Sequence, residues 1–128
     1  MNDNDHADDT PERRARGLEI MKRVYGWDQL GAGTGDFYAM TVEHLFAEVW
    51  SREGISDRDR RLLLLGLLVG QGMDEQINLQ LDAALRTGDL TAEELREIAV
   101  FLTHYAGWPR GAKLNTQVED LIDRLIRD

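Results

Sequence analysis

The sequence contains no cysteine among its 128 residues. This absence excludes disulfide bonds, thiolate metal sites and thiol nucleophiles, because each of them requires a cysteine sulfur. It also excludes the peroxidatic and resolving cysteines of thiol-based redox enzymes. Any chemistry of this chain therefore depends on other side chains.

Long hydrophobic runs are lacking as well. The longest, Leu62 to Val69, is about half of the ~20 residues that a membrane-spanning helix needs, so we expect a buried core helix there. Only 2 prolines are present, while Leu, Ala, Glu and Arg are abundant, which predicts an all-α fold. The acidic, polar residues 1–9 are the opposite of a secretory or transit peptide, so we expect a cytoplasmic protein.

Positive charge is scarce, because 15 Lys and Arg stand against 24 Asp and Glu and leave a net charge of -9. Neither nucleic acid nor an anionic membrane surface is expected as a partner, since either would need a basic face on the protein. Lys22 and Lys113 are the only lysines, and this preference for arginine indicates a GC-rich bacterial source.

What the sequence does contain is helical periodicity. At this length we expect one domain, with a disordered acidic tail over residues 1–9 and a helical domain over residues 10–128. The helix expected over about residues 56–69 is apolar nearly all round and should be buried on every side. Gly66 and Gly70 would allow a neighbouring helix to approach it closely. This excess of apolar surface predicts a homo-oligomer. The expected helices cover about residues 10–25, 36–50, 56–69, 74–87, 91–106 and 110–127.

The segment from Thr91 to Gly111 is the most informative one. Thr91 and Glu94 have the spacing of a capping box, and the helix that they open should stop at Gly107. Functional side chains crowd this stop, and a helix end of this kind suits a small-molecule site. A helix cap followed by a core aromatic explains the pattern equally well. The crowded side chains are those of His104, Tyr105, Trp108 and Arg110.

Histidines and carboxylates are the candidate acid–base groups. His6, His44 and His104 lie far apart without metal-ligand spacing, so no metal site is expected. His44 and Glu48 share a helix face and could form an acid–base pair, although an ordinary surface pair has the same spacing. Apolar neighbours in the sequence would raise the pKa of the Glu48 carboxyl, as in a general acid. A histidine in the apolar surroundings of His104 is more often a packing residue.

Five blocks of the sequence, in order and almost without gaps, resemble the carboxymuconolactone decarboxylase family. The resemblance covers about residues 15 to 125 and implies an alkylhydroperoxidase D-like fold of about six helices, assembled as trimers or hexamers. The Glu-Val-Trp-Ser and Tyr-Ala-Gly-Trp-Pro motifs are fairly specific to the family. The blocks are residues 46–54, 59–63, 81–88, 91–95 and 105–109.

The wider superfamily has a thiol peroxidase branch, which the lack of cysteine excludes here. The other branch implies a cofactor-free decarboxylation of a small anionic unsaturated lactone in aromatic catabolism. Such a site stabilises the dienolate oxygen that forms when CO₂ leaves, and it delivers a proton to carbon. It also needs a cation for the substrate carboxylate, ideally an arginine.

The family blocks imply roles for individual residues. Glu48 would donate or relay the proton, and Arg60 would contact the substrate anion, with Arg52 and Arg110 as further anion contacts. Aromatic side chains would form the substrate-binding wall. These are Trp50, Tyr105 and Trp108.

One position departs from the family. Where the fourth helix of the family has a histidine, this sequence has Gln80, and an amide cannot carry a proton at physiological pH. His104, from the neighbouring helix, is the candidate substitute. Two hypotheses follow: a cofactor-free enzyme acting on a small anionic lactone, or a non-catalytic or repurposed helical oligomer that binds a small molecule or a partner.

Overall fold

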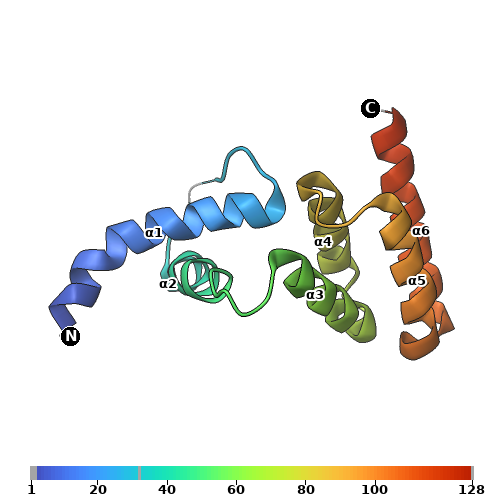
Figure 1. The fold of residues 1–128 in the computed structure, drawn as a ribbon, viewed down its shortest axis with the longest axis horizontal. Helices are drawn as coiled ribbons and strands as arrows, with labels where there is room; N and C mark the ends of the chain where they lie inside the picture. Colours follow the sequence, from blue (N-terminus) through green and yellow to red (C-terminus); the bar gives the residue numbers. More distant parts are fainter. Residues whose placement is uncertain (1–2, 32, 128) are drawn as a thin grey trace. The chain divides into compact units, whose positions relative to one another are not determined.

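The computed structural model describes the backbone of residues 3–31 and 33–127, and the side chains of residues 10–31 and 33–127. Every element of secondary structure in this part of the chain is a helix, which confirms the all-α prediction (Figure 1). No described helix is both long enough and apolar enough to cross a membrane. The elements are α1 (Asp3–Tyr25), α2 (Asp36–Met40), the π-helix η1 (Thr41–Val49), α3 (Asp57–Gln71), α4 (Asp74–Thr87), α5 (Ala92–Ala106) and α6 (Trp108–Arg127).

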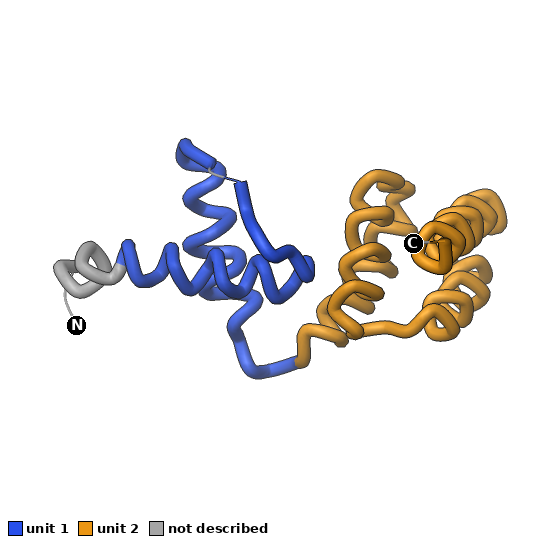
Figure 2. The backbone as a smooth tube through the Cα atoms, turned by 90° about the horizontal axis from the view of Figure 1, so that it is seen from above, with its two compact units in different colours: residues 1–55 blue, residues 56–128 orange. Residues whose placement is uncertain are grey.

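The chain forms two compact units, residues 1–55 and residues 56–128, and each is described by itself (Figure 2). Unit 1 contains α1, α2 and η1, and unit 2 contains α3 to α6. The predicted disordered tail, residues 1–9, lies outside the residues whose side chains are described. The tail and the single domain over residues 10–128 stay predictions.

Unit 1 is held together where α1 crosses η1. A Cβ atom on Gly17 would lie 1.9 Å from the Val42 carbonyl oxygen, so only glycine allows this close approach. Beside it, Arg14 donates from Nε and Nη2 to Oε2 of Glu43, at 2.8 and 2.6 Å. The buried residues of η1 are Val42, Phe46 and Ala47.

η1 corrects the prediction of one regular helix over residues 36–50, because residues 41–49 form a π-helix. The Trp50 N–H donates to the Leu45 carbonyl, five residues back, at 2.9 Å. Two of the buried residues of η1, Phe46 and Ala47, follow the third, Val42, by four and five positions, which matches this wider turn.

Unit 2 packs four helices around one apolar core. The capping box at the start of α5 is confirmed, since the Thr91 hydroxyl accepts from the Glu94 N–H and the Glu94 carboxylate accepts from the Thr91 N–H, both at 3.1 Å. α5 ends at Gly107, whose φ of 104° favours glycine, and α6 begins at once with Trp108. The core consists of Leu65, Leu68, Val69, Ile77, Leu81, Ala84, Leu90, Leu95, Ala99, Leu114, Val118, Leu121 and Ile122.

The expectation that α3 would be buried on every side is wrong for unit 2. Leu63 is 66% exposed and Leu67 is 55% exposed, because the other helices of the unit cover only one stripe of α3. Nothing lies within 4 Å of the positions where Gly66 and Gly70 would carry a Cβ atom. The predicted close approach of a neighbouring helix is therefore not made within the described structure.

Candidate functional site

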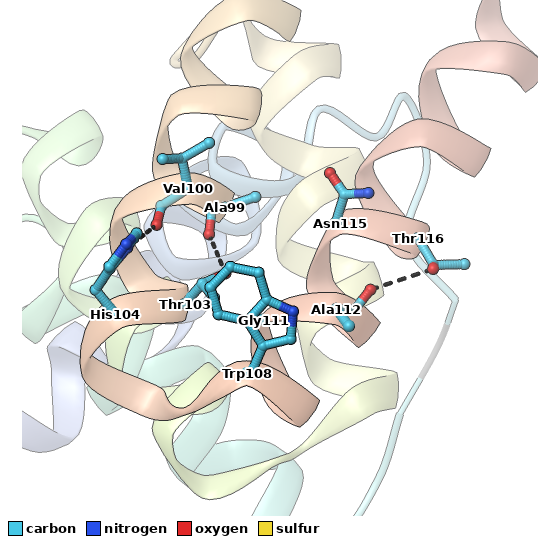
Figure 3. A pocket seen from close by; sticks show the side chains of 9 residues that line it. All are labelled: Ala99, Val100, Thr103, His104, Trp108, Gly111, Ala112, Asn115 and Thr116. Atoms are coloured by element: carbon cyan, nitrogen blue, oxygen red, sulfur yellow. Dashed lines mark hydrogen bonds between the residues drawn. The ribbon is translucent and has the colours of Figure 1, made fainter.

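A pocket of about 400 Å³ lies between the last turns of α5 and the first turns of α6 (Figure 3). We call it the α5–α6 pocket. Gly111 brings the two helices together at its base, since a Cβ atom there would lie 2.0 Å from the Thr103 hydroxyl oxygen. The lining residues are Ala99, Val100, Thr103 and His104 from α5, and Trp108, Gly111, Ala112, Asn115 and Thr116 from α6.

His104 is the only titratable residue among the nine that line this pocket. Its Nδ1 lies 2.8 Å from the Val100 carbonyl oxygen, and a carbonyl can only accept, so Nδ1 carries a hydrogen. Nε2 is then the nitrogen at which the ring gains or releases a proton. The Trp108 ring meets the imidazole edge-on, with 6.2 Å between ring centroids.

The remaining polar groups of the pocket are neutral. The Thr103 hydroxyl donates to the Ala99 carbonyl at 2.6 Å, and the Thr116 hydroxyl donates to the Ala112 carbonyl at 3.2 Å. Both hydroxyl oxygens keep lone pairs that can accept a hydrogen bond, and Asn115 adds an amide with donors and an acceptor. The pocket thus combines neutral polar groups, an aromatic ring and one imidazole.

The predicted aromatic wall residues lie in different places. Trp108 lines the α5–α6 pocket, whereas Tyr105 lies on a neighbouring face of α5, where it is 80% exposed and packs against Phe101 with 5.2 Å between ring centroids. Trp50 belongs to the core of unit 1, where its ring stacks on Phe46 at 6.2 Å.

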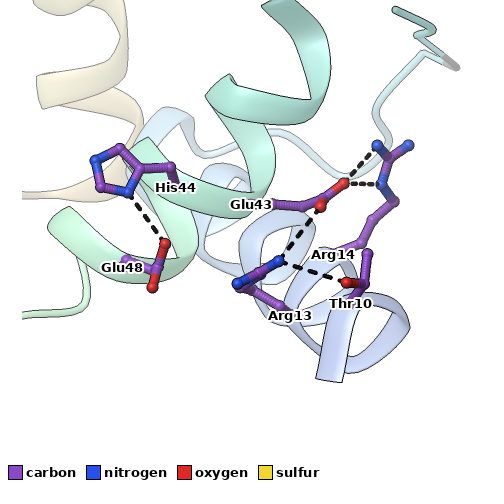
Figure 4. Close-up of polar contacts among 6 residues, drawn as sticks. All are labelled: Thr10, Arg13, Arg14, Glu43, His44 and Glu48. Atoms are coloured by element: carbon purple, nitrogen blue, oxygen red, sulfur yellow. Dashed lines mark hydrogen bonds and ion pairs between the residues drawn. The ribbon is translucent and has the colours of Figure 1, made fainter. Parts of the chain in front are cut away.

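The predicted pair of His44 and Glu48 is present on η1 in unit 1 (Figure 4). His44 Nδ1 lies 3.0 Å from Oε1 of Glu48, which confirms the hydrogen bond across one helix turn. The Glu48 side chain is 48% exposed, so the apolar enclosure expected from the sequence is missing from the structure. Glu48 belongs to unit 1, whereas Gln80 and His104 belong to unit 2.

Gln80 is buried and is held by an arginine that the sequence analysis did not single out. Arg61 is 0% exposed, and its Nη1 donates to Oε1 of Gln80 at 2.7 Å. Its Nη2 donates to Oδ2 of Asp89 at 3.2 Å. A buried charge is costly unless it is paired, and the Gln80 carbonyl and the Asp89 carboxylate meet that need for Arg61.

The burial of Arg61, though not its partners, could have been predicted from its spacing. It stands four residues before Leu65 and seven before Leu68, on the stripe of α3 that faces the core. Arg60, which the sequence analysis chose as the anion contact, is one position off this stripe and is partly exposed. Neither Arg60 nor Gln80 is a lining residue of the α5–α6 pocket.

No group of three or more His, Asp or Glu side chains in the described part of the chain could hold a metal ion. His44 on η1 is hydrogen-bonded to Glu48, and Arg61 on α3 is hydrogen-bonded to Gln80 on α4. Acid–base chemistry and binding through neutral groups are what the α5–α6 pocket can offer.

The family of the protein follows from its comparison with known sequences. The model of the carboxymuconolactone decarboxylase family matches residues 35–119, which is more than half of the chain. The chain belongs to the carboxymuconolactone decarboxylase family. The match includes Glu48 and every lining residue of the α5–α6 pocket.

Two relatives in this family carry the name of a decarboxylase. A 4-carboxymuconolactone decarboxylase of Acinetobacter baylyi is 29% identical over 105 residues, which make up 77% of this chain and 78% of that protein. A nitrosuccinic acid decarboxylase of Metarhizium robertsii is 28% identical over 133 residues, which make up 94% of this chain and 92% of that protein. The chain is therefore similar, over most of its length, to two proteins that are named as decarboxylases.

Proposed function

We propose that the protein is a cofactor-free decarboxylase of a small organic carboxylate, and that His104 in the α5–α6 pocket supplies the proton. Support comes from the two relatives, which are named for the loss of CO₂ from different acids. The observation that carries the assignment to this pocket is that His104 is its only titratable lining residue.

The reaction needs few parts. The bond between carbon and the carboxylate breaks, CO₂ leaves, and the electron pair moves into an acceptor within the substrate, such as a lactone carbonyl or a nitro group. The carbon then takes one proton, so the carboxylate and one proton give CO₂ and a product that is one carbon shorter. Electron storage by the substrate itself makes a cofactor unnecessary, and His104 Nε2 can donate the proton.

Both relatives point to substrates for a first assay, which are 4-carboxymuconolactone and nitrosuccinate. For the lactone, the proposal extends to a role in aromatic catabolism. Release of CO₂ by the purified protein tests the reaction directly, because it requires no knowledge of the product.

His104→Asn is the decisive variant, since asparagine keeps a polar side chain of similar reach but cannot carry a proton. We expect kcat to fall by at least about 100-fold, which is the usual contribution of a proton donor. His6→Asn removes a histidine that has no role in this proposal and tests whether loss of any histidine has this effect. Absence of turnover by the wild-type protein with both acids would favour the alternative of a binding protein without catalysis.

Glu48 is proposed as a proton relay, supported by its hydrogen bond to His44. Glu48→Gln keeps the shape and a carbonyl acceptor for His44 but cannot exchange a proton. A relay role predicts a loss of turnover of at least about tenfold. Unchanged turnover would restrict Glu48 to holding His44.

We also propose that the protein forms a homo-oligomer, as trimers or hexamers. Three aromatic side chains at the end of α5 and the start of α6 support this, since Phe101 is 62% exposed, Tyr105 80% and Trp108 70%. An apolar surface of this kind usually marks an interaction site. A molar mass of 14.6 kDa in size-exclusion chromatography with light scattering would contradict it, because this is the mass of one chain.

A further inference from the structure

We propose that the α5–α6 pocket binds the carboxylate of its substrate without a permanent cation, so that its only positive charge is the proton on His104 that turnover consumes. This inference rests on the proposed function and adds to it how the substrate is held. It also replaces the arginine that the sequence analysis expected at the substrate carboxylate.

The lining of the pocket is the first support. None of its nine residues is Lys, Arg, Asp or Glu, although 30% of the chain is charged. Ala99, Val100 and Ala112 contribute aliphatic surface, and the polar residues are neutral apart from His104.

The placement of the nearby cations is the second support. Arg110 and Lys113 of α6 line a separate cavity beside the C-terminal end of α3, where Arg110 Nε lies 3.4 Å from the position of a Cβ atom on Gly72. Arg96 of α5 is bonded to Glu93 at 2.6 Å and to Glu119 at 2.9 and 3.0 Å. None of these three cations lines the α5–α6 pocket, since Arg96 is held by two carboxylates and Arg110 and Lys113 line other cavities.

The movement of charge during the reaction explains why a pocket without a fixed cation would favour the loss of CO₂. A fixed cation beside the carboxylate would stabilise the substrate, but the negative charge moves to the acceptor as CO₂ leaves. Such a cation would therefore stabilise the ground state more than the transition state and would slow the reaction. A proton on His104 attracts the carboxylate during binding and is passed to carbon once CO₂ has left, so the pocket keeps no positive charge after the proton transfer.

Binding of two unreactive probes tests the charge arrangement. Benzoate and benzamide have the same ring but differ in charge, and the Trp108 indole signal reports on binding during an NMR titration. We expect the wild-type protein to prefer benzoate, and His104→Asn to reduce the ratio of benzoate to benzamide affinity by about tenfold. The proposal is overturned if His104→Asn keeps the wild-type preference, because a second cation must then be present, or if neither probe binds.

A cation placed in the pocket tests the catalytic consequence. Asn115→Lys should lower both KM and kcat, and should raise the preference for benzoate by about tenfold. Gln76→Lys adds the same charge on the exposed surface of α4, outside the lining of the pocket, and should do neither. A higher kcat for Asn115→Lys would overturn the proposal.

Failure of the proposed function would look different. If the wild-type protein releases no CO₂ but the probes show the expected pattern, the decarboxylase assignment fails and the charge arrangement of the pocket stands. If CO₂ is released and His104→Asn keeps the preference for benzoate, the decarboxylase assignment stands and this inference fails.

Discussion

Replacing Gln80 by leucine removes a hydrogen-bond acceptor of a fully buried charge. Arg61 is 0% exposed, and its Nη1 donates to Oε1 of Gln80 at 2.7 Å. Leucine has a similar size but cannot accept a hydrogen bond. Water cannot take its place without opening the core, so Gln80→Leu should leave this part of the guanidinium unsatisfied.

The size of the effect follows from the type of bond. A hydrogen bond to a charged group contributes about 1.5–3 kcal/mol, and leaving the buried partner unsatisfied costs about as much. Arg61 keeps its contact with Asp89 at 3.2 Å, so we expect a loss of about 2 kcal/mol in the free energy of unfolding. For a unit of this size, that lowers Tm by about 8 °C or more.

Thermal and urea unfolding, followed by circular dichroism, measure this loss. Gln80→Glu is the matched control, because a carboxylate keeps the acceptor and pairs with Arg61, so it should be more stable than Gln80→Leu at neutral pH. The double variant Arg61→Leu with Gln80→Leu removes both partners. It should be less unstable than the sum of the two single losses, since neither the Arg61 guanidinium nor the Gln80 carbonyl is left in the core without the other.

The reasoning fails if Gln80→Leu unfolds at the wild-type midpoint, or if the two single losses simply add. Either result would mean that Arg61 does not depend on the Gln80 carbonyl. The same geometry also bears on catalysis. Gln80→His should not introduce a proton donor, because a protonated imidazole beside the Arg61 guanidinium would place two cations in contact.

Two further predictions concern stability. Gly111→Ala should lower the free energy of unfolding by about 1–3 kcal/mol, because its Cβ atom would lie 2.0 Å from the Thr103 hydroxyl oxygen, whereas Gly66→Ala meets nothing within 4 Å and should be stabilising by about 0.5–1 kcal/mol. Urea titration of both variants measures the contrast, and equal losses would contradict the close approach of α5 and α6. Hydrogen bonds from Arg96 lower the pKa of the Glu119 carboxyl below its ordinary value of 4.5. A lowered pKa means that this pair stabilises the fold above about pH 4.5 and ceases to do so as the pH falls through the folded-state pKa. Glu119→Gln should therefore reduce the difference in stability between pH 7 and pH 3, and an unchanged difference would show that the exposed pair contributes nothing.

Most of the helices and several of their ends could be predicted from the sequence because the signals are local. The capping box of Thr91 and Glu94 and the stop at Gly107 involve residues only three or four positions apart or a single backbone conformation. α4 has the predicted bounds of residues 74–87, and the predicted bond between His44 and Glu48 spans one helix turn. Family membership belongs with these results, since ordered blocks of residues carry it and the family model confirms it.

The π-helix, the exposure of α3 and the role of Arg61 could not be predicted in the same way. Each depends on which face of a helix meets another helix, and contacts such as Arg61 with Asp89 join residues 28 positions apart. A sequence pattern shows that α3 is rich in leucine but does not show how many of its sides are covered. The sequence pattern therefore predicts that Leu63 and Leu67 lie in the core, whereas the structure exposes both.

The sequence by itself determined the all-helical class, several of the helix ends, the lack of thiol chemistry and the family. The tertiary structure decided which candidates meet in space. It brought His104 and Trp108 into one pocket, bound Gln80 to a buried arginine, and placed Arg110 and Lys113 of α6 in the lining of another cavity. The physical reason is that local hydrogen bonds and backbone conformations define helices, whereas packing between helices determines burial, charge and access at a site.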